Sequence, residues 1–165
     1  MFRSILSLLL ISPGFFQPAA HAAADDLIAV IHQTAQEQQI DPRIIAAIVK
    51  IESDFNVNAV SQMGAQGLMQ LMPVTQAEMK VHNPFDLHDN VRGGTAYFIK
   101  QYHRFNGDLD KALWAYNAGP SRVVQGFKPA ETQEYIRRFY LYLHALTLAS
   151  QTDLKETEVE EAEDD

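Results

Sequence analysis

The chain has 165 residues, 47% of them hydrophobic, and a formal net charge of −8 at pH 7. That length suffices for one domain with a hydrophobic core of its own. Because the chain contains no cysteine, it forms no disulfide and has no thiol nucleophile, and the absence of a basic patch disfavours nucleic-acid binding.

The N-terminus has the pattern of a secretory signal peptide. Arg3 supplies a positive charge, the apolar segment 5–11 follows it, and Ala20-His21-Ala22 offers an A-x-A cleavage site. The apolar run is too short for a transmembrane anchor. We therefore expect residues 1–22 to be removed by cleavage after Ala22, or one or two residues later, and the mature protein to be soluble outside the cytoplasm.

Between the two ends, residues 23–150 show apolar positions at helical spacing and no sustained alternation with a period of two. The sequence therefore predicts a mainly α fold, a single globular domain with few or no strands. The first expected helix starts at Asp26, with Leu27, Ile28, Ile31 and Ala35 facing inward. The other expected helices cover Pro42 to Glu52, Val74 to Met79, Val91 to Phe105, Asp108 or Asp110 to Tyr116, and about Thr132 to Leu148.

A glutamate closes the second of these helices. Asp41 is a good N-cap and Pro42 suits the first helical position. Ile45, Ile48 and Glu52 share one helix face, so burial should raise the pKa of the Glu52 carboxyl. A carboxyl group that stays protonated near neutral pH can act as a general acid. The pattern alone equally allows Glu52 to point into solvent from the last turn.

The C-terminal segment, residues 151–165, is acidic: eight Asp or Glu residues face a single opposing charge at Lys155. This composition is typical of a disordered, solubilising tail. A docking tail for a basic partner is the alternative.

Four polar or glycine-containing stretches stand out within the helical domain. They are Ile51 to Phe55, Gly64 to Pro73, Ala115 to Pro120 and Glu131 to Ile136. In order and spacing they resemble the SLT-type lytic transglycosylases, family 1, of the lysozyme superfamily. The resemblance covers about residues 27–145 and implies a lysozyme-like domain.

The resemblance also implies a mechanism in which one glutamate, here Glu52, works alone. It would first protonate the glycosidic oxygen between N-acetylmuramic acid and N-acetylglucosamine in peptidoglycan. As a carboxylate it would then take the proton of the muramyl 6-hydroxyl, which closes a 1,6-anhydro ring. Asp54 is a poor second carboxylate because residues two apart on a helix point to different sides. Asp86 and Asp89 are distant in sequence and stay open as partners.

The family's substrate-binding positions correspond one by one to polar and aromatic residues of this chain. They are Ser61, Gln70, Met72, Tyr116, Asn117, Glu131 and Tyr135. For some of them a purely structural role is the alternative: a turn for Ser61, a loop anchor for Gln70, core packing for Met72 and a favourable charge at a helix start for Glu131. Trp114 is expected in the core.

We expect no cofactor and no metal, because the six histidines are scattered without ligand spacing. The resemblance implies peptidoglycan glycan strands as the substrate and the periplasm as the location, with no nucleic acid, no membrane anchor and a monomeric state. By analogy with small secreted members, components of an envelope-spanning secretion, pilus or conjugation machine are expected partners. The alternatives are a non-cleaving peptidoglycan-binding assembly factor and a lysozyme-like hydrolase.

Overall fold

The computed structural model describes the backbone of residues 18–163 and the side chains of residues 24–152. Its helices are α2 (Pro18–Gln38), α3 (Pro42–Ser53), α4 (Pro73–Met79), α5 (Leu87–Arg104), α6 (Leu109–Ala118), α7 (Pro120–Val124) and α8 (Ala130–Glu163). Within this part of the chain no strand forms, and only isolated bridges join Gln66 to Val60 and to Leu71. The mainly α prediction is confirmed.

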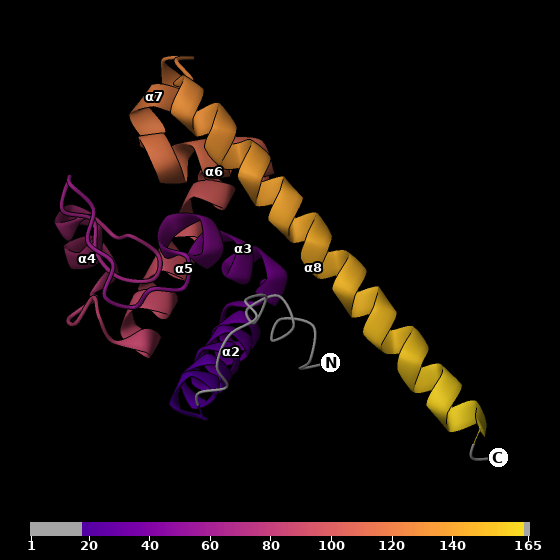
Figure 1. The fold of residues 1–165 in the computed structure, drawn as a ribbon. Coiled ribbons are helices and arrows are strands. Elements are labelled where there is room, and N and C mark those ends of the chain that lie inside the picture. The colour runs from indigo at the N-terminus through magenta and orange to yellow at the C-terminus, as the bar shows by residue number, and fades with distance from the viewer. Residues whose placement is uncertain (1–17, 164–165) are drawn as a thin grey trace.

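Helix α3 lies at the centre of the fold (Figure 1). Its residues from Ile45 to Val49 are almost completely buried. It packs against α2 on one side and α8 on the other, while α5 joins α2, α4 and α6. Asp41 caps α3 as expected, because its carboxylate accepts the Arg43 backbone N–H at 2.8 Å. Glu52 thus lies in the last turn of a helix whose middle is almost completely buried.

Several helices are longer than the sequence predicts. Helix α2 begins at Pro18 rather than at Asp26, since the alanine-rich segment before Asp26 favours a helix. Helix α5 begins at Leu87, with Asp86 as its N-cap, rather than at Val91. Helix α7 is an additional single turn after Gly119.

The last helix is the largest difference. Helix α8 continues to Glu163 and extends past the other helices, although composition predicted a disordered acidic tail from residue 151 (Figure 1). Glutamate, alanine and leucine are good helix formers, and the packed first half of α8 provides the costly nucleus from which a helix propagates. Charge alone therefore did not determine the backbone conformation here.

Most of the expected signal peptide, residues 1–17, lies outside the described residues, and residues 18–22 belong to the start of α2. None of the helices described is both long and apolar enough to cross a membrane.

Candidate active site

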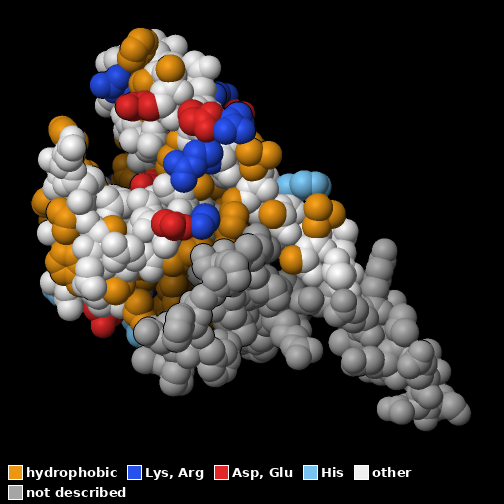
Figure 2. Space-filling view, viewed as in Figure 1, with side chains coloured by type: hydrophobic (Ala, Val, Ile, Leu, Met, Phe, Trp, Pro, Cys, Tyr) orange, Lys and Arg blue, Asp and Glu red, His pale blue; other side chains and the backbone are white. Residues whose placement is uncertain are grey.

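The elements that carry the site residues form two parts of the molecule. One part is α4 with the loop before it, and the other is α6, α7 and the first turns of α8, with α3 and α5 between them (Figure 1). Figure 2 shows the surface hollowed between these two parts. Glu52 lies at the C-terminal end of α3, in the middle of this arrangement.

The chain turns sharply directly after Glu52. Asp54 is the C-cap of α3 in the left-handed conformation, with a φ of 52°, and Phe55 follows with a φ of 63°. Two successive non-glycine residues with positive φ are uncommon and store backbone strain. The side chain of Asp54 forms an ion pair with Lys50 on the exposed side of the helix. Asp54 therefore ends the helix.

Glu52 is only partly exposed and has one hydrogen-bond donor, the hydroxyl group of Tyr135, which lies 2.8 Å from Glu52 Oε1. Burial raises the pKa of the Glu52 carboxyl to about 7, against the opposing effects of the Tyr135 hydrogen bond and the nearby positive charge of Arg138. A carboxyl group with such a pKa is protonated in part of the population at neutral pH and can both donate and accept a proton.

Within the part of the chain whose side chains are described, no second carboxylate acts on the Glu52 pKa. Among the described residues, the groups that perturb its pKa are Tyr135 and Arg138. Asp86 caps α5 by accepting the Asp89 backbone N–H, and Asp89 in turn accepts the backbone N–H groups of His82 and Asn83. These two aspartates, which the sequence left open as partners, are thus engaged at the start of α5.

Tyr116 joins α6 to the glycine-containing loop. Its hydroxyl donates to the Met69 carbonyl at 2.8 Å, and its ring lies 5.5 Å from that of Tyr97. Burial and the nearby Glu52 charge raise the pKa of Tyr116 well above its ordinary value, so the two side chains are within electrostatic reach of each other. The Tyr116 hydroxyl therefore stays protonated, and its single hydrogen can be donated to only one acceptor at a time.

The backbone of that loop is held by Asn90, a fully buried asparagine of α5. Asn90 Oδ1 accepts the Met69 N–H at 2.8 Å, and its Nδ2 donates to the carbonyls of Pro84 at 2.8 Å and Gln66 at 3.1 Å. Gly67 sits against this amide with a φ of 78°, and a Cβ there would lie 2.0 Å from the Pro84 carbonyl oxygen. Sequence reasoning missed Asn90, because nothing local marks it among its helical neighbours.

Ser61 and Gln70 form hydrogen bonds within the same loop. Ser61 Oγ accepts the Ala65 N–H at 3.0 Å. Gln70 has a φ of 48°, and its Nε2 donates to the carbonyls of Gly67 at 2.9 Å and Ala59 at 3.1 Å. Both side-chain amide hydrogens of Gln70 are thereby used, so the contacts of Gln70 are those of a loop anchor. A contact between Gln70 and a sugar stays a prediction, and this contact would use Oε1, since Nε2 already donates twice.

The other expected binding residues differ in exposure. Met72 and Glu131 are exposed, at the start of α4 and of α8, and Tyr135 is 7% exposed with its hydroxyl on Glu52. Asn117 Oδ1 accepts the Thr132 hydroxyl at 2.7 Å and so ties the end of α6 to the start of α8. Trp114 is buried as expected, with the Lys128 ammonium 5.1 Å from its ring centre.

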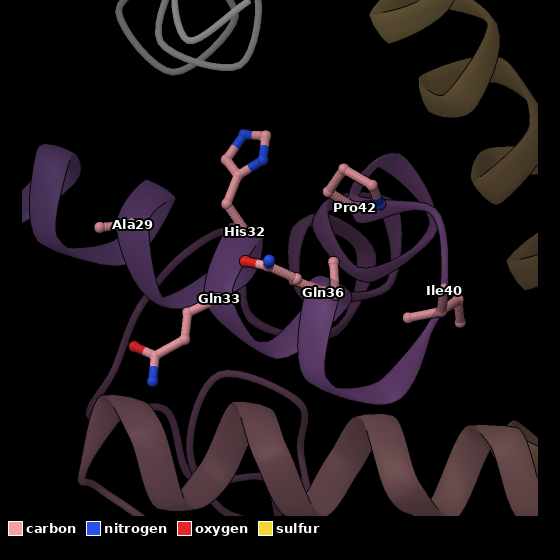
Figure 3. Close-up of a pocket in the computed structure, with 7 residues that line it drawn as sticks. Ala29, His32, Gln33, Gln36, Ile40 and Pro42 are labelled. Atoms are coloured by element: carbon pink, nitrogen blue, oxygen red, sulfur yellow. The ribbon is translucent and has the colours of Figure 1, made fainter.

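A separate cavity of about 550 Å³ lies along α2, where Ala29, His32, Gln33, Ala35 and Gln36 meet Ile40 and Pro42 (Figure 3). None of the sequence-predicted site residues lines it. It is therefore distinct from the site that includes Glu52.

Comparisons with known proteins agree with this arrangement. A family model described as the transglycosylase SLT domain matches residues 29–139. A transglycosylase of Enterobacteria phage PRD1 is 37% identical over 64% of this chain and 38% of its own length. A membrane-bound lytic murein transglycosylase F of Desulfosudis oleivorans is 39% identical over 57% of this chain and 22% of its own length. This chain thus spans much less than the full length of these relatives.

Solved structures of similar fold include an inactive mutant of the lytic transglycosylase Slt from Pseudomonas aeruginosa. It superposes with a TM-score of 0.65 and 28% identity, covering 75% of this chain and 24% of that one. The 70 kDa soluble lytic transglycosylase SLT70 of Escherichia coli gives a TM-score of 0.63 and 25% identity, covering 72% of this chain and 23% of that one. The family match covers most of this chain and includes Glu52, Tyr116 and Tyr135, so the chain belongs to the transglycosylase SLT domain family.

Proposed function

We propose that this chain is a peptidoglycan lytic transglycosylase. It cleaves the β-1,4 bond between N-acetylmuramic acid and N-acetylglucosamine and leaves a 1,6-anhydromuramyl end. The observation that carries this proposal is the Glu52 carboxyl, which has a pKa of about 7, one hydrogen-bond donor in Tyr135 and no neighbouring carboxylate among the described residues. Family membership and the names of the relatives support the same reaction.

In the first step, protonated Glu52 donates its proton to the glycosidic oxygen while the bond from that oxygen to C1 of the muramyl residue breaks. The N-acetylglucosamine leaves with a 4-hydroxyl, and positive charge develops at C1. The Tyr135 hydroxyl, 2.8 Å from Glu52 Oε1, then stabilises the new carboxylate.

In the second step, the Glu52 carboxylate removes the proton of the muramyl 6-hydroxyl as that oxygen bonds to C1. Glu52 regains its proton, and no water is consumed. One group can serve both steps because its pKa of about 7 lies between those of a strong acid and a strong base. Glycosidases that use two carboxylates place them about 5–9.5 Å apart, and no described carboxylate is among the groups that act on the Glu52 pKa.

In this proposal the remaining predicted site residues bind the glycan or hold the structure that binds it. Met72 and Glu131 are exposed at the start of α4 and of α8, and Tyr116 and Asn117 hold the surrounding structure through Met69 and Thr132. Ser61 and Gln70 shape the loop that precedes α4.

Product analysis tests the reaction. Purified protein should release anhydromuramyl products from peptidoglycan, as read by mass spectrometry, and Glu52→Gln should abolish them. The matched control is Asp54→Asn, which changes an exposed carboxylate two residues away and should keep the activity. Products with only reducing muramyl ends would identify a lysozyme-like hydrolase. Binding to peptidoglycan without any cleavage would identify an assembly factor.

We further propose that the chain works as a monomer in the periplasm, after removal of residues 1–22, and opens the wall locally for an envelope-spanning machine. The charged start, apolar run and A-x-A site of those residues support export. Expression in a Gram-negative host should yield a periplasmic protein that begins close to Ala23. Retention of Met1 in the cytoplasmic fraction would contradict export.

A further inference from the structure

Helix α8, which packs alongside α3, contacts the end of α3 through two of its tyrosines (Figure 1). The hydroxyl of Tyr135 donates to Glu52 Oε1 at 2.8 Å. Seven residues later, the ring of Tyr142 lies 6.3 Å from that of Phe55. Because residues seven apart lie on the same face of a helix, both tyrosines project toward the end of α3. One contact holds the Glu52 carboxyl, and the other holds the chain three residues after it.

The backbone after Glu52 needs such support. Asp54 and Phe55 have φ angles of 52° and 63°, a conformation that non-glycine residues keep only where the surrounding structure holds them in it. The Asp54 N–H donates to the Lys50 carbonyl at 3.0 Å, which closes the turn within its own segment. The contact between Phe55 and Tyr142 is what attaches this turn to α8.

A lysine completes this contact. Lys50 belongs to the last turn of α3, and its ammonium lies 5.6 Å from the ring centre of Phe55 and 5.9 Å from that of Tyr142. A cation within about 6 Å of an aromatic ring is attracted to its face. The ammonium therefore favours the position in which the two rings meet. Its ion pair with Asp54, whose side chain is 75% exposed, adds little. We call Lys50, Phe55 and Tyr142 the ring cluster.

The hydroxyl of Tyr142 does not explain the presence of this residue. The hydroxyl oxygen is buried and has no hydrogen-bond partner within the part of the chain whose side chains are described. Burial and the charge of Asp54 raise the pKa of Tyr142 to about 12. A buried hydroxyl without a partner is unfavourable, so the ring is the part of Tyr142 that contributes to the fold. A phenylalanine at this position would keep the contact with Phe55.

We propose that Tyr142 is a positioning residue, whose ring, with Phe55 and Lys50, keeps the turn after Glu52 in place and so holds the Glu52 carboxyl beside Tyr135. The inference rests on the proposed function in that Glu52 is the group that performs the reaction. The ring cluster acts on that group through the backbone of the turn.

The pKa of Glu52 reports whether the turn is in place. The groups that act on this pKa are Tyr135 and Arg138 of α8, Tyr116 of α6 responds to the Glu52 charge, and residues 55–73 contain no titratable side chain. No member of the ring cluster is among these groups. Burial raises the Glu52 pKa by more than the Tyr135 hydrogen bond lowers it. A turn that opens and admits water should therefore lower the pKa of Glu52.

The experiment compares Tyr142→Leu, which removes the ring, with Tyr142→Phe, which removes only the hydroxyl. Titration by ¹³C NMR gives the midpoint of the Glu52 carboxyl carbon, and product release from peptidoglycan gives kcat and KM. The matched control is Tyr140→Leu, which removes an exposed ring of the same helix whose hydroxyl donates to Asp110. Lys50→Met is a milder second variant, and it decides the question if Tyr142→Leu does not fold.

We expect Tyr142→Leu to lower the Glu52 midpoint by about one unit and kcat by about tenfold, with little change in KM. Tyr142→Phe and Tyr140→Leu should keep the wild-type values. Lys50→Met should lower the midpoint by less, although the loss of a positive charge alone would raise it. An unchanged or raised midpoint in Tyr142→Leu and Lys50→Met, or an equal effect of Tyr142→Phe, would overturn the proposal.

The two proposals fail separately. A wild-type protein that releases no anhydromuramyl products would defeat the proposed function. The Glu52 midpoint is measured without substrate, so it decides in either case whether Tyr142 positions the Glu52 carboxyl.

Discussion

The hydroxyl of Tyr135 donates to Glu52 Oε1 across 2.8 Å and across 83 residues of sequence. This bond joins the end of the central helix α3 to the first turns of α8, and it gives the Glu52 carboxyl one defined orientation. It favours the carboxylate, whereas burial favours the protonated acid, and burial has the larger effect on the Glu52 pKa. The chain thus holds a carboxyl group that exchanges a proton close to neutral pH.

Replacing Tyr135 by Phe should raise the pKa of Glu52 further, because the hydrogen bond that stabilises the carboxylate is lost. The alkaline limb of the pH dependence of kcat/KM, where activity falls as Glu52 deprotonates, should therefore move to higher pH. Stability should fall by about 1 kcal/mol. Tyr140→Phe is the control, since that hydroxyl bonds Asp110 on the exposed side of α8. An alkaline limb that stays in place would show that Tyr135 does not act on Glu52.

Glu52→Gln should stabilise the protein at neutral pH. The folded-state pKa of about 7 lies above the ordinary value of 4.5, so the native state binds more protons than the unfolded state between these two values. The free energy of unfolding of wild type therefore falls as pH rises from 4.5 to about 7. The variant lacks this loss, so its advantage should grow over the same range, to at most about 3 kcal/mol.

Urea unfolding of the two proteins between about pH 4 and 8 measures that difference. Curves that differ by a constant amount at every pH would mean that Glu52 ionises as an exposed glutamate does.

Asn90→Ala should be among the most damaging single substitutions outside the apolar core. It removes three hydrogen bonds and leaves the Met69 N–H and the carbonyls of Gln66 and Pro84 without their partner. At about 1–3 kcal/mol for each buried group left unpaired, we expect a loss of about 3 kcal/mol or more. Asn83→Ala, which removes one exposed turn contact to the Phe85 N–H, is the control for urea unfolding. A loss no larger than that of Asn83→Ala would refute this role.

Tyr116→Phe should loosen the loop that Asn90 also holds. The variant keeps the ring but loses the hydrogen bond to the Met69 carbonyl, at a cost of about 1 kcal/mol in stability. Because Met69 lies in the loop beside the site, kcat should fall by more than this small change in folding explains. Tyr97→Phe, at the ring that contacts Tyr116, serves as the matched control. Equal kcat values in the two variants would argue against a role for the Tyr116 hydroxyl.

The central helix could be predicted because its signals are local. Asp41 and Pro42 mark the start of α3, the buried isoleucines follow at helical spacing, and Asp54 ends it. The ends of α2 and α8 were predicted less well. The sequence started the first helix at Asp26 and ended the last at about Leu148, whereas the backbone is helical from Pro18 and as far as Glu163, as the high helix propensity of those residues favours.

The site required contacts that no local pattern reports. Glu52 was found from its helix face, and Tyr135 was named only through the family resemblance, without its hydrogen bond to Glu52. Asn90 and Arg138 escaped notice because an asparagine within a helix and an exposed arginine look ordinary in sequence. Only the packing of α5 against the loop and of α8 against α3 gives them partners or a place beside the acid.

The central claim is that one carboxyl group, Glu52, changes its protonation near neutral pH. The most direct measurement is a titration of the glutamate side-chain carboxyl carbons by ¹³C NMR, with the Glu52 signal assigned as the one missing in Glu52→Gln. We predict a midpoint of about 7 for that signal. A midpoint close to the ordinary value of 4.5 would contradict the account.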